Sequence, residues 1–291
     1  MFRAFLSLTR PANLVTAIAD VLAGMAIAGY FLTSAPDPAP VGWLCLATLG
    51  LYGGGVVFND VFDAELDAIE RPERAIPSGL VSKSAATGLG AALLGLGIVA
   101  AFLANQTAGL IAVGIAVASL VYDRFGKHHA LLGPLNMGLC RGLNLLLGVS
   151  IFPEQLGPWT WVGLVPVVYI AAITMISRGE VHGGKSGTMR AAGLLYALVI
   201  GCVAALAQQR GQLGTALPFL ILFGYYIFPP LWRAVRNPIG PNIGMAVRAG
   251  VLSLIVMNAA WVAAFASFPL AMLVFCLLPL SRLLAKVFAV T

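Results

Sequence analysis

Apolar runs of about 20 residues recur from one end of the chain to the other, separated by polar segments. Helices of this length cross a bilayer with every backbone polar group satisfied, so the pattern predicts an all-α polytopic membrane protein. We expect ten transmembrane helices, at about residues 11–33, 41–62, 85–104, 107–123, 134–152, 159–177, 191–208, 213–232, 244–267 and 269–288. If the last run lies in the membrane interface, the number is nine.

The composition agrees with this prediction. Of the 291 residues, 60% are hydrophobic and 10% are charged, whereas a soluble domain has about 25% charged residues. No soluble segment of useful size remains, so we expect residues 1–291 to form a single membrane domain. The four cysteines lie in separate apolar runs without a metal-ligand spacing, which favours packing roles.

The basic residues fall on one side of the predicted topology. With a cytoplasmic N-terminus and ten spans, all of the 17 Lys and Arg lie on the cytoplasmic side except Arg210, which lies outside, and Arg141, which lies within a span. Orientation in the membrane and contact with the lipid bilayer therefore explain the net charge of +6, and no nucleic acid partner is expected. Nearly all acids share this side, where we expect the chemistry to take place.

The second apolar run ends in a segment rich in oxygen-bearing side chains. Three of these side chains recur every four residues and so share one helix face, with two further acids beside them: Asn59, Asp63 and Asp67, then Asp60 and Glu65. Such carboxylates repel one another unless a cation joins them. Mg²⁺ prefers these oxygen ligands and usually binds substrate phosphates as well.

Two arginines, Arg71 and Arg74, follow the acidic segment within a few residues. Guanidinium groups match phosphate oxygens in shape and charge. The segment therefore predicts a metal–diphosphate site at the membrane surface. The alternative is a solvated acidic helix end, since acids are common at membrane borders.

Two motifs in this region resemble those of a known family. Asn59-Asp60-x-x-Asp63-x-x-x-Asp67 matches the NDxxDxxxD motif of the UbiA superfamily of intramembrane prenyltransferases, and the loop 71–79 matches that family's RPxRPxxSG loop. Arg10-Pro11, ahead of the first span, also fits. The stretches 126–142 and 177–184 look like those of the EboC-like bacterial branch of the superfamily.

The resemblance implies a helical bundle that binds a polyprenyl diphosphate with its tail among the helices. Two aspartate-bearing motifs would hold Mg²⁺ on the diphosphate, the allylic C–O bond would ionise, and an unidentified acceptor would attack the carbocation. The motif match places four residues at the metal site, namely Asn59, Asp60, Asp63 and Asp67, and two over it, Arg71 and Arg74. The three aspartates are the catalytic candidates, and Asn59, Arg71 and Arg74 are candidates for contact with the diphosphate. It also implies a bacterial inner membrane location.

The sequence departs from the family pattern in two places. The second motif normally carries two aspartates, but the corresponding loop 177–185 has none. Its candidates are Glu180 and His182 as metal ligands or bases, with Arg178 and Lys185 as cationic contacts to the diphosphate. Either cationic side chains partly replace one Mg²⁺, or the protein no longer ionises a diphosphate. The family's YxxxK pattern is one residue longer here, which makes Lys127 a diphosphate candidate that needs testing.

Polar residues inside the predicted spans supply candidates for an acceptor site or pocket. A charged residue in a span is functional by default, but Arg141 and Asp20 are equally expected to form a plain interhelical ion pair. Asn13 opens the first span, and Asn136 precedes Arg141 by about one helical turn. Tyr122 is a candidate for an aromatic pocket around the carbocation, with packing as its alternative, and His182 completes the set.

Two other functions are compatible with a polytopic membrane protein. A CDP-alcohol phosphotransferase is also a Mg²⁺ membrane enzyme, but its series of Asp-Gly and Ala-Arg pairs is absent. A transporter or lipid-binding subunit that retained the fold would explain the loop without aspartates. Transport favours acids at the bilayer midplane, whereas here the acids gather at one face.

Overall fold

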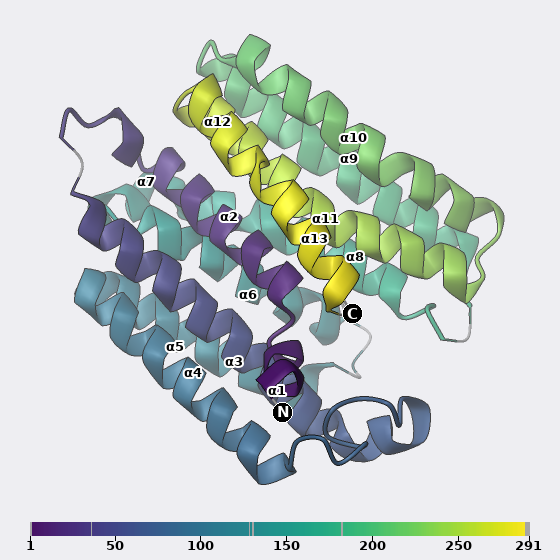
Figure 1. The fold of residues 1–291 in the computed structure, drawn as a ribbon. Coiled ribbons are helices and arrows are strands. Elements are labelled where there is room, and N and C mark those ends of the chain that lie inside the picture. Colours follow the sequence, from purple (N-terminus) through teal and green to yellow (C-terminus); the bar gives the residue numbers. More distant parts are fainter. Residues whose placement is uncertain (1, 36, 128, 130, 182, 289–291) are drawn as a thin grey trace.

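The computed structural model describes residues 2–35, 37–127, 129, 131–181 and 183–288, and these residues form helices and connecting turns without a strand (Figure 1). Within them, eight helical segments are long and apolar enough to cross a membrane. They are α3 (Pro38–Glu70), α4 (Lys83–Ala104), α5 with η2 (Gln106–Gly126), η3 to α8 (Pro153–Ser177), α9 (Ser186–Gln209), α10 (Leu213–Arg236), α11 (Gly240–Phe265) and α12 with α13 (Phe268–Val287). The protein is therefore an integral, multi-pass membrane protein, as predicted.

Two further helices occupy the remaining predicted spans. They are α2 (Pro11–Ile27), which is apolar but short, and α6 (Leu132–Val149). The smaller elements are α1 (Phe2–Leu8), η1 (Tyr30–Leu32), the π-helical turn η2 (Tyr122–Gly126), η3 (Pro153–Gln155), α7 (Leu156–Trp159), η4 (Thr160–Gly163), α8 (Leu164–Ser177), α12 (Phe268–Phe275) and α13 (Leu277–Val287). The ten helical segments agree with the expected nine to ten spans.

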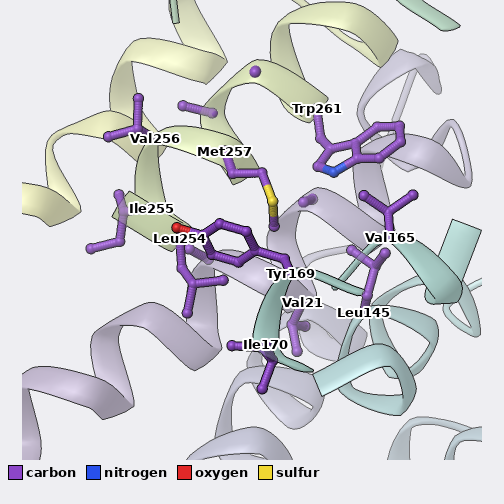
Figure 2. Close-up of a cluster of buried hydrophobic side chains, with 14 of the residues drawn as sticks. Val21, Leu145, Val165, Tyr169, Ile170, Leu254, Ile255, Val256, Met257 and Trp261 are labelled. Carbon is purple, nitrogen blue, oxygen red and sulfur yellow. The ribbon is translucent and has the colours of Figure 1, made fainter. Parts of the chain in front are cut away.

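The bundle has two sides joined by a central group of helices. Figure 1 shows α3, α4 and α5 on one side and α9 and α10 on the other, with α2, α6 and α11 between them. The centre is packed with large side chains such as Tyr169 and Trp261, which are fully buried (Figure 2). At the crossing of α2 and α6, a Cβ on Gly24 would lie 2.1 Å from the Leu145 carbonyl oxygen, so only glycine permits this approach.

The structure corrects the predicted ends of three elements. Helix α3 continues to Glu70, well beyond the expected end at residue 62, because Ala64 and Asp67 are buried on its inner face and Arg74 pairs with Asp67. The span expected to end at about residue 123 continues through the π-helical turn η2 to Gly126. The last predicted span is two helices that meet at Cys276.

A small second core positions the chain around the end of α3. Leu8 of α1, Val57 and Val61 of α3, and Val81 pack together, with Ile76 of the loop 71–79 against them. This cluster is separate from the main core. It therefore fixes the arginine-bearing loop beside the acidic end of α3.

Candidate active site

A cavity of about 430 Å³ lies between α2, α3, α5, α6, α8 and α11. Its walls are largely apolar, with Leu51, Ile115, Met137, Ile170 and Leu254 among the lining residues. Polar and charged side chains line it where α3 ends. The cavity therefore joins a charged region to a space suited to a hydrocarbon chain.

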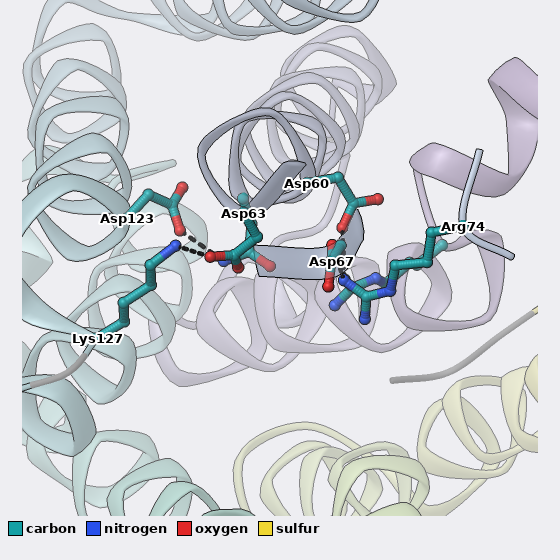
Figure 3. Close-up of polar contacts among 8 residues, drawn as sticks. Asp60, Asp63, Asp67, Arg74, Asp123 and Lys127 are labelled. Carbon is teal, nitrogen blue, oxygen red and sulfur yellow. Dashed lines mark hydrogen bonds and ion pairs between the residues drawn. The ribbon is translucent and has the colours of Figure 1, made fainter. Parts of the chain in front are cut away.

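The acidic end of α3 faces the cavity with one side of the helix. Asn59, Asp63 and Asp67 all line the cavity, as their four-residue spacing predicts. Asp60 points elsewhere: its Oδ1 lies 2.9 Å from Arg10 Nη2 and 3.4 Å from Arg74 Nη1. It lines a separate cavity of about 420 Å³. Of the four motif residues, Asp60 is thus the one that the structure directs away from the main cavity (Figure 3).

Arg10 reaches Asp60 from an unusual backbone position. It is the only described non-glycine residue with a positive φ, 47°, immediately before α2 begins at Pro11. A non-glycine residue in this region is strained and is tolerated where the surroundings hold it. Arg10 lines both cavities, as do Arg71 and Arg74, so three guanidinium groups separate the two spaces.

The two motif acids that face the main cavity, Asp63 and Asp67, are each paired with a cationic side chain. Arg74 Nη1 lies 2.8 Å from Asp67 Oδ2, and Lys127 forms an ion pair with Asp63 (Figure 3). Arg71 and Lys127 also line the cavity, beside these pairs. These motif acids are therefore paired with cationic side chains rather than exposed to solvent.

The extra residue between Tyr122 and Lys127 is absorbed by the π-helical turn. The Lys127 N–H donates to the Tyr122 carbonyl 2.9 Å away, five residues back. A π-helical turn contains one residue more than an α-helical turn. Lys127 consequently follows Tyr122 by one turn, as the family's shorter spacing would place it. Tyr122 lines the cavity as well.

Asp123 is a cavity residue that the sequence analysis missed. Its side chain is 3% exposed, it lines the cavity, and its Oδ1 accepts a hydrogen bond of 2.8 Å from Asn59 Nδ2. The signal in the sequence was an acid at the end of an apolar run, directly after Tyr122. Its partner on α3 is distant in sequence, so spacing alone does not identify it.

The loop 177–185 contributes one described acid to the cavity. Glu180 lines it, and burial raises the pKa of the Glu180 carboxyl while Arg71 opposes the shift. Arg178 instead donates to the His129 carbonyl at 2.5 Å, and Lys185 precedes α9; neither is among the described cavity-lining residues. His182 lies outside the part of the chain that the structure describes.

Two of the buried polar candidates, Arg141 and Asp20, belong to a hydrogen-bonded network beside the cavity. Arg141 Nη1 lies 2.5 Å from Asp20 Oδ2, which realises the interhelical ion pair. Arg141 also lies over the Tyr52 ring at 4.8 Å. Asn13, Asn144 and Arg141 line the cavity. These groups add buried polar side chains to the otherwise apolar lining of the cavity.

Asn136 supports the π-helical turn. With its amide oriented to satisfy both neighbours, its nitrogen donates to the Ala118 carbonyl at 3.1 Å and its oxygen accepts from the Tyr122 N–H at 3.2 Å. Asn136 therefore braces the segment that carries Tyr122, Asp123 and Lys127. This placement differs from the pocket position that its spacing to Arg141 suggested.

The donor set suits a hard divalent cation that binds together with an anion. The oxygen donors near the end of α3 include the Asn59 amide and the carboxylates of Asp63, Asp67 and Asp123. Among the described residues, no three acids, histidines or cysteines converge closely enough to hold a metal ion alone. Mg²⁺ is commonly held by one or two carboxylates and completed by phosphate oxygens and water. The ammonium of Lys127 on Asp63 shows that a positive charge is stabilised at this position.

Comparison with known proteins supplies the family context. The sequence profile of the UbiA prenyltransferase family matches residues 21–182. The digeranylgeranylglyceryl phosphate synthase of Metallosphaera sedula is 28% identical over 242 residues, which cover 80% of this chain and 84% of the relative.

Solved structures share the fold at low identity. The apo structure of a UbiA homolog from Aeropyrum pernix K1 has a TM-score of 0.70 at 18% identity, covering 85% of this chain and 96% of that one. A UbiA homolog from Archaeoglobus fulgidus bound to DMAPP and Mg²⁺ has a TM-score of 0.67 at 16% identity, covering 91% and 99%.

Proposed function

Because the chain belongs to the UbiA prenyltransferase family, we propose that it ionises a polyprenyl diphosphate at the acidic end of its cavity and transfers the prenyl group to an acceptor within the membrane. The observation that carries this function is the cavity itself. It places the α3 acids and three cationic side chains, Arg71, Arg74 and Lys127, at one end of an apolar space. Diphosphate and isoprenoid chain each have a matching environment there.

Ionisation of an allylic diphosphate moves negative charge onto the leaving group. When bound, Mg²⁺ offsets this charge. Asn59, Asp63 and Asp67 are the α3 residues that would hold it, and Arg71 and Lys127 donate hydrogen bonds to phosphate oxygens. The apolar wall excludes water from the carbocation. Glu180, with its raised pKa, is placed to accept a proton from the acceptor.

We assign Asp60 a different task from the other motif acids. Its ion pairs with Arg10 and Arg74 hold both arginines between the two cavities. Asp60 then acts on the diphosphate through those arginines. Replacing it would misplace them, so activity still falls, but the affinity for metal falls less than on replacement of Asp63.

The acceptor of the prenyl group is a separate proposal. We propose an alcohol that carries a phosphate group, since the Metallosphaera sedula relative is named as a synthase of a glyceryl phosphate lipid. The second cavity offers a place for such a phosphate, because it is lined by Arg10, Arg71 and Arg74. A phosphate there would lie next to the main cavity without entering its apolar part.

Three finer proposals concern the whole protein. We propose one membrane domain over residues 1–291, with its N-terminus in the cytoplasm of a bacterial cell, supported by the distribution of the 17 Lys and Arg. We also propose a place in the EboC-like branch, supported by the stretches 126–142 and 177–184. Labelling of single cysteines introduced near Arg210 and near Glu65 would test the orientation. Outside reagents should reach only the first.

The acceptor proposal is tested by supplying purified protein in lipid nanodiscs with labelled geranylgeranyl diphosphate, Mg²⁺ and paired alcohols with and without a phosphate group. Labelled product with the phosphate-bearing alcohol alone would support the proposal. Equal transfer to both alcohols would refute the phosphate requirement. Labelled donor moved across vesicles without any product would favour a carrier over an enzyme.

A further inference from the structure

Asp123 is the third aspartate at the cavity, after Asp63 and Asp67, and it does not come from the loop in which the family carries its second aspartate motif. That loop, 177–185, contains no aspartate. Asp123, in the η2 turn, lines the same cavity as the α3 acids and is 3% exposed. A buried ionised carboxylate is costly unless it is paired or binds a cation. Among the described side chains, the one that donates a hydrogen bond to it is Asn59, a neutral amide.

The bond between Asn59 and Asp123 orients both groups. An ionised carboxylate only accepts, so the Asn59 nitrogen must face Asp123. The Asn59 carbonyl oxygen then remains for another donor or a cation. Asn59 and Asp63 are one turn apart on α3, and both line the cavity. Oxygen donors from α3 and from η2 therefore face one another across the cavity.

A positive charge already occupies this position. Lys127 lies one turn after Asp123 and forms an ion pair with Asp63. Figure 3 shows the Lys127 amine and the carboxylates of Asp63 and Asp123 directed at the same space. The Lys127 side chain is 12% exposed, and its long stem can redirect the ammonium toward a bound diphosphate. Lys127 thus acts as the cation of the site when no metal is present.

The backbone of this segment is also specialised. The η2 turn is π-helical, and π-helical turns occur frequently at functional sites. The extra residue in the turn keeps both Asp123 and Lys127 beside the cavity. Asn136 braces the turn through the Ala118 carbonyl and the Tyr122 N–H.

We propose that Asp123 is a metal ligand and forms, with Asn59 and Asp63, the binding site for one divalent cation. Asp123 thereby takes over a role of the aspartates that loop 177–185 lacks. When the metal binds, the Lys127 ammonium moves from Asp63 to the diphosphate. The proposal rests on the proposed function, because the metal and the diphosphate belong to that reaction. It predicts that metal affinity depends on η2, and that Lys127 competes with the metal in the absence of diphosphate.

The test measures binding of Mn²⁺ by electron paramagnetic resonance, with and without inorganic pyrophosphate. Asp123→Asn preserves the shape and the bond to Asn59 but removes the charge, and it should weaken Mn²⁺ binding at least about tenfold. Lys127→Met should strengthen Mn²⁺ binding roughly tenfold without pyrophosphate, because the competing ammonium is gone. The matched control is Glu65→Gln on the exposed side of α3, which should bind Mn²⁺ within about twofold of the parent.

A second variant guards against a loss of structure in Asp123→Asn. Asp123→Cys should bind Cd²⁺ more tightly than the parent and Mn²⁺ less tightly, because a thiolate prefers softer metals. Mn²⁺ binding within twofold of the parent in both Asp123 variants would overturn the proposal while leaving the proposed function intact. A parent protein that binds no Mn²⁺ even with pyrophosphate would overturn both.

Discussion

Arg141 Nη1 lies 2.5 Å from Asp20 Oδ2 inside the bundle, where the two side chains are 7% and 1% exposed. Further hydrogen bonds complete the pair: Arg141 Nη2 donates to Thr16 at 2.7 Å, and Asn258 Nδ2 donates to Asp20 Oδ1 at 2.6 Å. The network joins α2, α6 and α11, the helices at the centre of the fold. It is therefore a structural connection between these helices, and its members Arg141 and Asn144 also line the cavity.

Removal of one partner of this pair should destabilise the protein. Arg141→Met leaves the Asp20 carboxylate buried without its counter-charge, at a cost of about 3–5 kcal/mol. The double variant Asp20→Leu with Arg141→Met should recover most of that loss, because two apolar side chains need no counter-charge. Thermal unfolding in detergent measures both. A double variant less stable than Arg141→Met would contradict the account of the pair.

The crossing of α2 and α6 should not tolerate a methyl group. A Cβ on Gly148 would lie 2.1 Å from the Val21 carbonyl oxygen, and Gly24 has the matching contact from the other helix. Gly148→Ala should lower stability by about 1–3 kcal/mol despite the better helix propensity of alanine. Gly95→Ala on α4 has no neighbour within 4 Å and should be neutral or slightly stabilising. Equal unfolding temperatures for the two variants would show that the helices can separate at little cost.

Periodicity was sufficient to predict the helical spans and the face of α3 that carries Asn59, Asp63 and Asp67. These features are local, because a helix repeats every 3.6 residues and a span has a fixed length. The direction of Asp60 was not predictable in this way. It depends on Arg10, which is 50 positions away in sequence and held in a left-handed backbone conformation.

Asp123 illustrates the same limit at the site. The family motifs directed attention to loop 177–185, whereas the buried acid lies in η2. Its contact with Asn59 spans 64 positions. The π-helical character of η2 has only a weak signal in the sequence, the single extra residue between Tyr122 and Lys127. Tertiary packing determines the contact between Asn59 and Asp123 and the π-helical form of η2, and the periodicity of a single sequence does not predict them.

The extra residue in η2 leads to a prediction of its own. Phe125 is 74% exposed, and its deletion would let the π-helical turn become α-helical with Lys127 still one turn after Tyr122. The deletion variant should keep its affinity for inorganic pyrophosphate within about threefold, whereas Lys127→Met should lose roughly tenfold or more through loss of a charged hydrogen bond. Calorimetric titration with pyrophosphate and Mg²⁺ measures both. A deletion as damaging as Lys127→Met would refute this explanation of the longer spacing.

Glu180 should make stability depend on pH. Its folded-state pKa is raised by burial, so folding favours the protonated carboxyl. The stability that the protonated Glu180 carboxyl contributes is fully present below the unfolded pKa of about 4.3. It is lost as the pH rises through the higher folded pKa. The side chain in Glu180→Gln stays neutral at every pH. The unfolding temperature of this variant minus that of the parent should therefore increase by roughly 1–3 °C from pH 4 to pH 8 in the absence of Mg²⁺. A difference that shrinks with rising pH would contradict the direction of the shift.

The central claim is that the carboxylates on the inner face of α3 support metal-dependent cleavage of a prenyl diphosphate. Its most direct measurement is the release of pyrophosphate from geranylgeranyl diphosphate by purified protein in nanodiscs, with Mg²⁺ or with EDTA. The account predicts Mg²⁺-dependent release that falls at least about 10²-fold in Asp63→Asn and stays within twofold in the exposed control Glu65→Gln. Release that persists in EDTA, or that is unchanged in Asp63→Asn, would contradict it.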